Sequence, residues 1–221
     1  MLSARKSLSQ WMMGAVASVM VLLGAARQSH ADIITTLVGS PVQSGNQYLY
    51  TYDVELSFDS QIAPNMPMPE FGTLYDYSNQ LPAVQNVTGD LLADFAFTYS
   101  LTNTAAYKVA PTDSSALYNI RFTYTGNTTL VGAPYDVVIG GNSVQVGTNL
   151  LDLGQFTLTS PTNITQSAFY DGQSFNSFGA SAGTPQGNVG STVVPAPVPE
   201  PTCLGILGIG AFGLLGRRRR A

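Results

Sequence analysis

The sequence predicts an all-β fold, an antiparallel β-sandwich, over the central part of this chain. Apolar and polar residues alternate in three stretches with the period of two that is typical of a half-buried strand. No stretch between residues 32 and 198 shows a sustained 3.6-residue period with a helix cap, so the pattern favours sheets. The three alternating stretches are residues 48–58, 95–101 and 118–124.

The alternation separates two faces in each stretch. The polar face of residues 48–58 includes Asp53 and Glu55. The opposite faces hold aromatic and aliphatic residues, so we expect them, tyrosines included, to pack in a core. They are Tyr48, Tyr50, Tyr52, Val54, Leu56 and Phe58, then Phe95, Phe97, Tyr99 and Leu101, and finally Tyr118, Ile120, Phe122 and Tyr124.

Four shorter segments are weaker strand candidates because each is brief and bordered by Gly, Pro, Asn or Asp. They are residues 33–38, 135–139, 143–146 and 155–159. Ile139-Gly140-Gly141-Asn142-Ser143 has the composition of a hairpin turn between two of them. Several short strands separated by turns favour a sandwich of the Ig-like or jelly-roll-like kind.

Two segments interrupt the strand pattern. Residues 63–89 begin with three prolines in seven residues, which predicts a long surface connection with Tyr75 and Tyr77 as candidates for exposure. Residues 179–198 are rich in Gly, Ser, Thr and Pro, which predicts a flexible linker. We therefore place the β-sandwich domain at residues 32–178.

The amino-terminal region has the features of a secretory leader. The basic pair Arg5-Lys6 precedes an apolar stretch at residues 11–26, and Ser29-His30-Ala31 fits a small-x-small cleavage site. We expect a signal peptide over residues 1–31, which signal peptidase removes by cutting between Ala31 and Asp32. A retained anchor helix is the alternative, since the apolar stretch is only slightly shorter than a membrane span.

The charge and the cysteine content of the chain argue against a nucleic-acid partner and against stabilisation by a disulfide. Residues 32–198 hold two cationic residues, Lys108 and Arg121, against twelve acidic ones, which gives a net charge of −10. Such a surface repels phosphate groups, so we expect no nucleic-acid partner. The single cysteine, Cys203, allows no disulfide within the chain, and the domain must be stable through its core alone.

The last 23 residues contain three elements in a fixed order. The tripeptide Pro199-Glu200-Pro201 is followed by an uncharged apolar run from Thr202 to Gly216 and then by four arginines before a terminal alanine. The arginines are Arg217, Arg218, Arg219 and Arg220. This order resembles the sorting signal of PEP-CTERM proteins, which Gram-negative bacteria export and a membrane-bound exosortase processes. The resemblance covers residues 199–221 alone.

The resemblance implies roles for these elements. Pro199, Glu200 and Pro201 would be the recognition motif, residues 202–216 the transmembrane segment, and residues 217–220 the stop signal. Fifteen residues make a helix of about 22 Å, short for a hydrocarbon core of about 30 Å. Clustered arginines stay on the cytoplasmic side. An ordinary tail anchor, or a lipid on Cys203, are the alternatives.

We therefore expect an exported protein that is first an inner-membrane intermediate and then reaches the cell surface or the extracellular space.

The mature domain has no histidine and no cysteine, so catalysis by Ser-His-Asp, Cys-His or histidine-metal sites is excluded. We expect no catalytic residues, no cofactor and no resident metal. Asp53 and Glu55, about 7 Å apart on one strand face, are a candidate cation site, although a solvated outer face explains them more simply.

The leading functional prediction is a non-catalytic surface or matrix protein, a structural or adhesive component associated with exopolysaccharide. One alternative is a module that binds carbohydrate or another repetitive surface, including ice-type surfaces. Another is a glycan-active enzyme that uses acidic residues alone, for which the domain offers two glutamates, Glu55 and Glu70.

Overall fold

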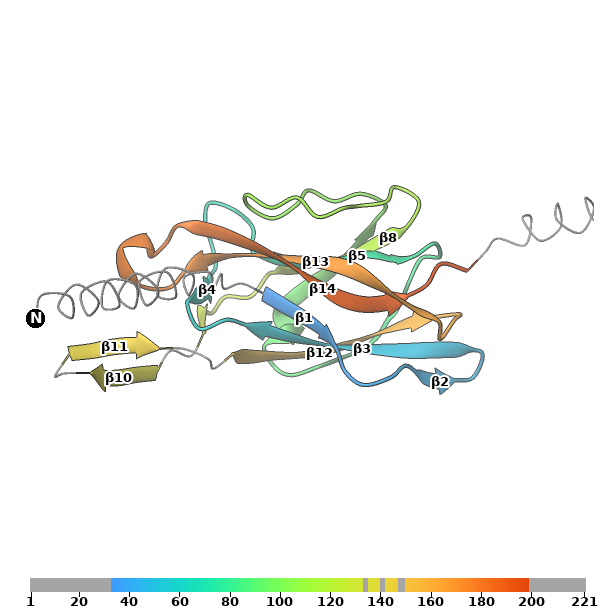
Figure 1. Ribbon diagram of the computed structural model, residues 1–221, viewed down its shortest axis with the longest axis horizontal. Coiled ribbons are helices and arrows are strands. Elements are labelled where there is room, and N and C mark those ends of the chain that lie inside the picture. Colours follow the sequence, from blue (N-terminus) through green and yellow to red (C-terminus); the bar gives the residue numbers. More distant parts are fainter. Residues whose placement is uncertain (1–32, 133–134, 140–141, 147–149, 199–221) are drawn as a thin grey trace, which may run out of the picture. The chain divides into compact units, whose positions relative to one another are not determined.

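The fold is all-β with antiparallel sheets (Figure 1). The computed structural model describes residues 33–132, 135–139, 142–146 and 150–198. Within these residues, helix is limited to two short 3₁₀ turns, η1 (Leu92–Asp94) and η2 (Gly179–Ser181). The predicted signal peptide and the apolar run 202–216 lie outside the described residues.

The first sheet contains the longest predicted strand. Its order is β1-β3-β12-β6, and the short β2 also pairs with β3. All of its pairings are antiparallel. The strands are β1 (Ile33–Leu37), β2 (Val42–Ser44), β3 (Gln47–Leu56), β6 (Val84–Thr88) and β12 (Leu151–Ser160).

The second sheet has the order β7-β8-β5-β13-β4-β9, with β14 paired to β13. A separate hairpin pairs β10 (Tyr135–Ile139) with β11 (Asn142–Val146). The strands of the second sheet are β4 (Ser60–Ile62), β5 (Phe71–Ser78), β7 (Phe95–Ser100), β8 (Tyr118–Tyr124), β9 (Leu130–Val131), β13 (Thr165–Asn176) and β14 (Pro185–Pro195).

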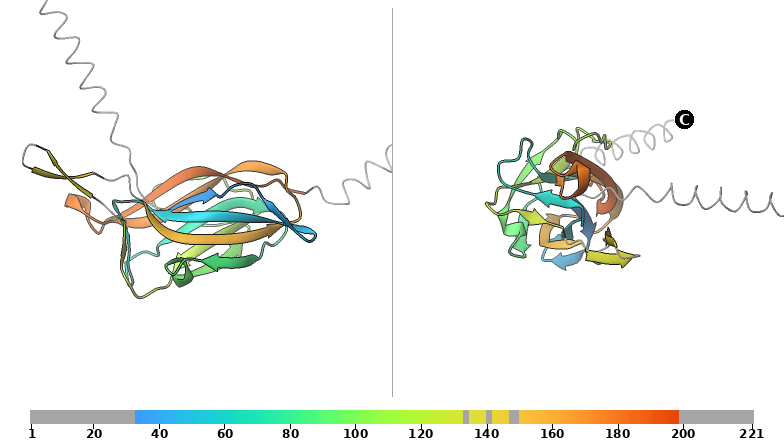
Figure 2. Two further views of the ribbon diagram at one scale, coloured as in Figure 1. Left: turned by 90° about the horizontal axis from the view of Figure 1, so that it is seen from below. Right: turned by 90° about the vertical axis from the view of Figure 1, so that its left-hand side faces the viewer.

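One aromatic core joins the two large sheets. Tyr50, Tyr52, Val54 and Leu56 alternate along β3 and are fully buried, as their pattern predicts. Across the core, the rings of Tyr52 and Tyr77 meet edge to face at 6.3 Å. Strands of both sheets surround this core in the right-hand view of Figure 2.

The strand predictions for residues 48–58, 95–101 and 118–124 are confirmed by β3, β7 and β8. β3 ends at Leu56 and β7 at Ser100, and Leu101, which was expected in the core, is 41% exposed. The weaker candidates are also strands, β1, β10, β11 and β12, of which β12 is twice as long as predicted. Ile139 and Asn142 are paired across the predicted hairpin, whose turn residues lie outside the described part. An Ig-like or jelly-roll-like arrangement stays a prediction.

The prediction of a surface connection over residues 63–89 is wrong for residues 71–78 and for residues 84–88, which form β6 and pair with β12. Residues 71–78 form β5, which lies between β8 and β13 and is buried on both faces. Tyr77 packs in the core against Tyr50, and Tyr75 points to the opposite face of the sheet, so neither is exposed. Burial on both faces removes the apolar-polar alternation on which the strand prediction relied.

The prediction of a flexible linker over residues 179–198 is wrong for residues 185–195. These residues form β14, which pairs with β13 along its whole length. Main-chain hydrogen bonds can hold a strand whatever its side chains, and at one position of β14 a ring packs directly against a glycine. A Cβ atom on Gly190 would lie 2.4 Å from the ring of Tyr170. The β domain therefore continues to Pro195.

Loops gather at two opposite ends of the domain. We call one of them the β2 end, made of residues 38–47, 79–83 and 161–164 with the last described residues, 196–198. The pairing of Tyr48 with Ser160 brings residues 161–164 beside the β2–β3 hairpin. The amide of Thr159 donates to Ala83 at 3.3 Å, and that of Ala196 donates to Ile164 at 2.7 Å.

The other end, which we call the Glu70 end, is made of residues 57–59, 63–70, 89–94 and 125–129. The main-chain amide of Tyr124 donates to the carbonyl of Glu70 at 3.0 Å, and that of Thr125 donates to Asp94 at 2.8 Å. Because β3 and β12 run antiparallel between the two groups of loops, these ends are separated by the length of the strands.

Candidate functional site

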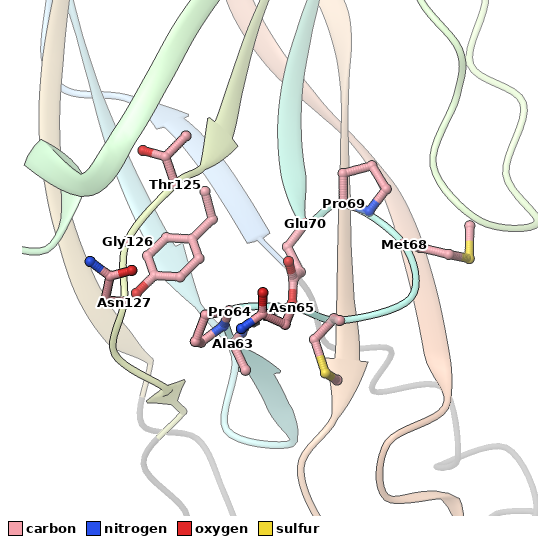
Figure 3. Close-up of a pocket in the computed structure, with 11 residues that line it drawn as sticks. Ala63, Pro64, Asn65, Met68, Pro69, Glu70, Thr125, Gly126 and Asn127 are labelled. Atoms are coloured by element: carbon pink, nitrogen blue, oxygen red, sulfur yellow. Dashed lines mark hydrogen bonds between the residues drawn. The ribbon is translucent and has the colours of Figure 1, made fainter.

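A pocket of about 320 Å³ opens at the Glu70 end. One wall is the connection between β4 and β5, residues 63–70, and the other is formed by residues 124–127 at the end of β8. Figure 3 shows Asn65 and Glu70 on the first wall and Gly126 and Asn127 on the second. The pocket thus combines two loops that are far apart in the sequence.

The first wall is restricted in its backbone conformation. Its three prolines have φ fixed near −65°, which lowers the number of conformations open to the loop. Asn65 adopts a φ of 62°, in the left-handed region that asparagine tolerates better than most residues. The loop is therefore shaped before any ligand arrives, which reduces the entropy lost on binding.

Glu70 supplies the carboxyl group of the pocket. Glu70 is 5% exposed, and its Oε1 atom accepts a hydrogen bond from the main-chain amide of Ala63 at 3.0 Å. Burial raises the pKa of the Glu70 carboxyl, and the hydrogen bond from Ala63 opposes this rise. The carbonyl of Glu70 also binds the amide of Tyr124, so one residue connects both walls.

The second wall is held by Tyr124 and Asp94. The Tyr124 hydroxyl donates to the carbonyl of Thr128 and accepts from its amide at 3.2 Å. A Cβ atom on Gly126 would lie 2.4 Å from this hydroxyl and 2.7 Å from Oδ2 of Asp94, so a larger residue would displace these side chains. Asp94 thus lies directly behind the wall, a position that sequence reasoning did not indicate.

The lining suits a neutral, hydroxyl-rich ligand better than an anion. Among the lining residues that the structure describes, Glu70 is the acidic one, Asn65 and Asn127 carry side-chain amides, and none is cationic. Side-chain amides donate and accept hydrogen bonds with hydroxyl groups, and a carboxylate accepts them, whereas an anion would be repelled by the Glu70 carboxylate. In the described ranges, no three His, Cys, Asp or Glu side chains are grouped to hold a metal ion.

Asp53 and Glu55 lie elsewhere, on the outer face of the first sheet. Register places Asp152 opposite Glu55 and Gln155 opposite Asp53. Partial burial, then the negative charges of Asp53 and Asp152, raise the pKa of the Glu55 carboxyl. A cation there stays a prediction. Glu55 lies on β3 of the first sheet, whereas Glu70 lies in the loop that precedes β5 of the second sheet.

The structure also contains a buried polar cluster that no sequence pattern predicted. Asp171 on β13 is fully buried, and its Oδ2 accepts from the hydroxyl of Tyr75 at 2.8 Å and the amide of Ala106 at 2.7 Å. Burial raises the pKa of this carboxyl, while the hydrogen bonds and the nearby Arg121 oppose the rise. Gln173 binds the amide of Tyr107 at 2.9 Å. The cluster fixes the loop that follows β7 against the second sheet.

Comparison with protein families identifies the carboxyl-terminal region. Residues 197–220 match the family model described as the PEP-CTERM protein-sorting motif. The chain carries a PEP-CTERM sorting motif. The motif indicates an exported protein that is sorted through the membrane and processed by an exosortase. No curated protein and no solved structure matches the chain.

The PEP-CTERM motif begins where the folded domain ends. β14 ends at Pro195, and the carbonyl of Val198 still accepts a hydrogen bond from Nδ2 of Asn79 at 2.9 Å. The match therefore starts at Pro197 with no unstructured spacer before it. None of the helices in the described ranges has the length and apolar character needed to cross a bilayer.

Several predicted site residues lie outside the described part of the chain, and their predictions stay as stated. They are the recognition tripeptide Pro199, Glu200 and Pro201, the cluster Arg217, Arg218, Arg219 and Arg220, and the cleavage position between Ala31 and Asp32. The lining residues Asn65 and Asn127, and Asp94 behind them, had no sequence signal beyond their polar character, because loops assemble them. Tyr124, at the end of β8, was expected in the core from its strand pattern.

Proposed function

We propose that the processed protein is a non-catalytic component of the cell surface or extracellular matrix, with a structural or adhesive role in association with exopolysaccharide. The sorting motif at residues 197–220 carries this proposal, because it indicates an exported protein that is sorted through the membrane and processed by an exosortase. The compact core supports it, since a domain without disulfides must persist outside the cell through packing alone.

The test follows the protein in its own host. Wild-type chain is expected to be recovered without its leader and without residues beyond the motif, as read by intact-mass analysis. Glu200→Ala is expected to leave the carboxyl-terminal segment in place and the protein in the membrane fraction. Glu70→Gln, at the far end of the domain, serves as the matched control and is expected to be sorted normally. Normal release of the Glu200→Ala variant would contradict the proposal.

A second candidate, a carbohydrate-binding module, is favoured by the pocket at the Glu70 end. A carboxylate and two amides on restricted loops form the kind of polar group that orients a sugar in a pre-shaped pocket. Loss of a hydrogen bond to a charged group lowers binding free energy by about 1.5–3 kcal/mol, so Glu70→Gln should weaken binding about tenfold or more.

The binding experiment uses the processed protein and exopolysaccharide purified from the same host, with affinity measured by calorimetry. Glu55→Gln is the control, because Glu55 lies on the outer face of the other sheet, and its affinity should equal that of the wild type. Turnover of the polysaccharide, lost in Glu70→Gln or Asp94→Asn, would instead favour the acidic-residue enzyme. Equal affinities of all variants would remove the pocket from consideration.

A further inference from the structure

We propose that the β2 end of the domain rests on the lipid bilayer while the carboxyl-terminal segment is still attached, so that apolar side chains of three loops enter the membrane interface. The occupant of this surface is thus a phospholipid bilayer. The inference rests on the membrane route that the sorting motif indicates and on our prediction that residues 202–216 enter the bilayer. It does not depend on the matrix role.

Exposure of apolar side chains is greatest at this end. Ile164 is 67% exposed, Val42 is 64% exposed and Leu81 is 63% exposed, and these are the highest values among large apolar side chains of residues 33–132 and 150–198. Each belongs to a different segment of the β2 end: Val42 begins β2, and Leu81 and Ile164 lie in two separate loops. Hydrogen bonds hold these loops together, since the Tyr50 hydroxyl donates to Thr162 at 3.0 Å and Thr159 donates to Ala83. Three separate segments therefore expose apolar side chains at the same end of the domain.

Charge is missing from the same loops, although the domain as a whole is strongly acidic. Residues 38–47, 79–83, 161–164 and 196–198 contain no Asp, Glu, Lys, Arg or His. Asp76 and Asp113, which belong to the neighbouring region of the second sheet, are bound to main-chain amides of Ser114 and Asn103. A charge-free surface with apolar tips loses no ion hydration when it meets the membrane interface.

The chain itself brings this end to the membrane. Val198 is bound to Asn79 of the β2 end, and the apolar run begins at Thr202. Four residue steps span at most about 14 Å, even if fully extended. The headgroup region of one leaflet is about 5–8 Å thick. The loops therefore lie within reach of the bilayer for as long as the carboxyl-terminal segment stays inserted.

A protein partner, or a second copy of this chain, would need a different kind of surface on the β2 end. Specific protein interfaces depend on anchoring aromatic or arginine side chains, and these four segments contain neither residue type. Short, uncharged loops tipped by Val, Leu and Ile suit the lipid interface, where apolar insertion needs no fixed partner geometry. The contact would end when exosortase removes the segment.

The experiment measures contact with lipid at single positions in the full-length chain. The protein is reconstituted in vesicles of phosphatidylethanolamine and phosphatidylglycerol that contain no other protein, and an environment-sensitive fluorophore is attached to one cysteine. The test position is Leu81→Cys in a Cys203→Ala background. The matched control is Val131→Cys in that background, since Val131 is also exposed but belongs to β9, away from the β2 end. Native Cys203, labelled in the unchanged chain, reports on the apolar run.

The expected result is a blue shift and strong quenching by spin-labelled lipid for the probes at Leu81 and Cys203, and neither effect for the probe at Val131. Quenching at Cys203 but not at Leu81 would overturn the proposal and leave the membrane route intact. Absence of quenching at both would remove its premise and overturn it as well. A blue shift at Leu81 that disappears on dilution of protein in lipid, without lipid quenching, would identify a second copy as the occupant.

Discussion

The two ends of this domain differ in the charge of their loops and in the kind of surface that they expose. The β2 end is free of charged residues in its loops, carries the most exposed apolar side chains and leads directly into the sorting motif. The Glu70 end holds Asp59, Glu70, Asp90 and Asp94 and contains a pocket. The same sheets support both. The difference teaches that loop composition, and not the strands, gives the two ends their different surfaces.

The largest expected effect compares one glycine from each region. Gly154, in the β12 bulge beside β6, has a φ of +122°, and a Cβ atom there would lie 2.1 Å from the carbonyl of Thr88. We expect Gly154→Ala to lower the free energy of unfolding by about 3 kcal/mol. Gly45 in the β2–β3 hairpin has a φ of +62° and open space, so Gly45→Ala should cost about 1 kcal/mol. Urea unfolding measures both losses of free energy. Equal losses would contradict the prediction that the backbone is packed more closely around Gly154 than around Gly45.

The second prediction concerns pH. Burial raises the pKa of the carboxyls of Glu70 and Asp171. A raised carboxyl pKa means that the folded state binds more protons, so its stabilising contribution is complete below the ordinary pKa and is lost as pH rises through the raised one. We therefore expect a higher Tm at pH 5 than at pH 8. Glu70→Gln should reduce this difference, whereas a Tm that falls on acidification to pH 5 would contradict it.

The third prediction concerns the hydrogen bond that ties the carboxyl terminus to the β2 end. Asn79→Ala removes the contact with Val198, worth about 1 kcal/mol, but it also removes a buried Oδ1 atom that has no partner. The global free energy of unfolding should therefore change by less than this amount. Hydrogen exchange at the amide of Ala196 should become faster, because the segment is released at one point. Unchanged exchange there would show that Asn79 does not hold the terminus.

The smallest effect is expected from exposed apolar residues. Leu81→Ser at the β2 end and Val131→Ser near the other end should each change the free energy of unfolding by no more than about 0.5 kcal/mol. Their side chains are mostly in water, so folding buries little of either. Chemical denaturation checks this, and a large loss for Leu81→Ser alone would indicate that Leu81 packs within the domain instead of facing the membrane.

Much of the fold could be predicted from local pattern, and the exceptions have one cause. β3 and β8 have one face in the core and the other outward, so alternation revealed them. β5 is covered on both faces and β14 is built from small residues, so neither shows this signal. For the site, the two glutamates were identified as candidates, but nothing local indicated that Glu70 would face Asn127 across a pocket.

The sequence by itself determined the all-β class, the acidic character of the domain and the sorting motif. The class follows from the period of alternation, the acidity from the count of charged residues, and the motif from the order of residues in a short tail. Only the tertiary structure decided that Tyr75 and Tyr77 are buried, that residues 185–195 form a strand, and that charge-free loops and acidic loops gather at opposite ends. These features depend on strand pairing between distant segments, in which main-chain hydrogen bonds and burial outweigh the local preference of each residue.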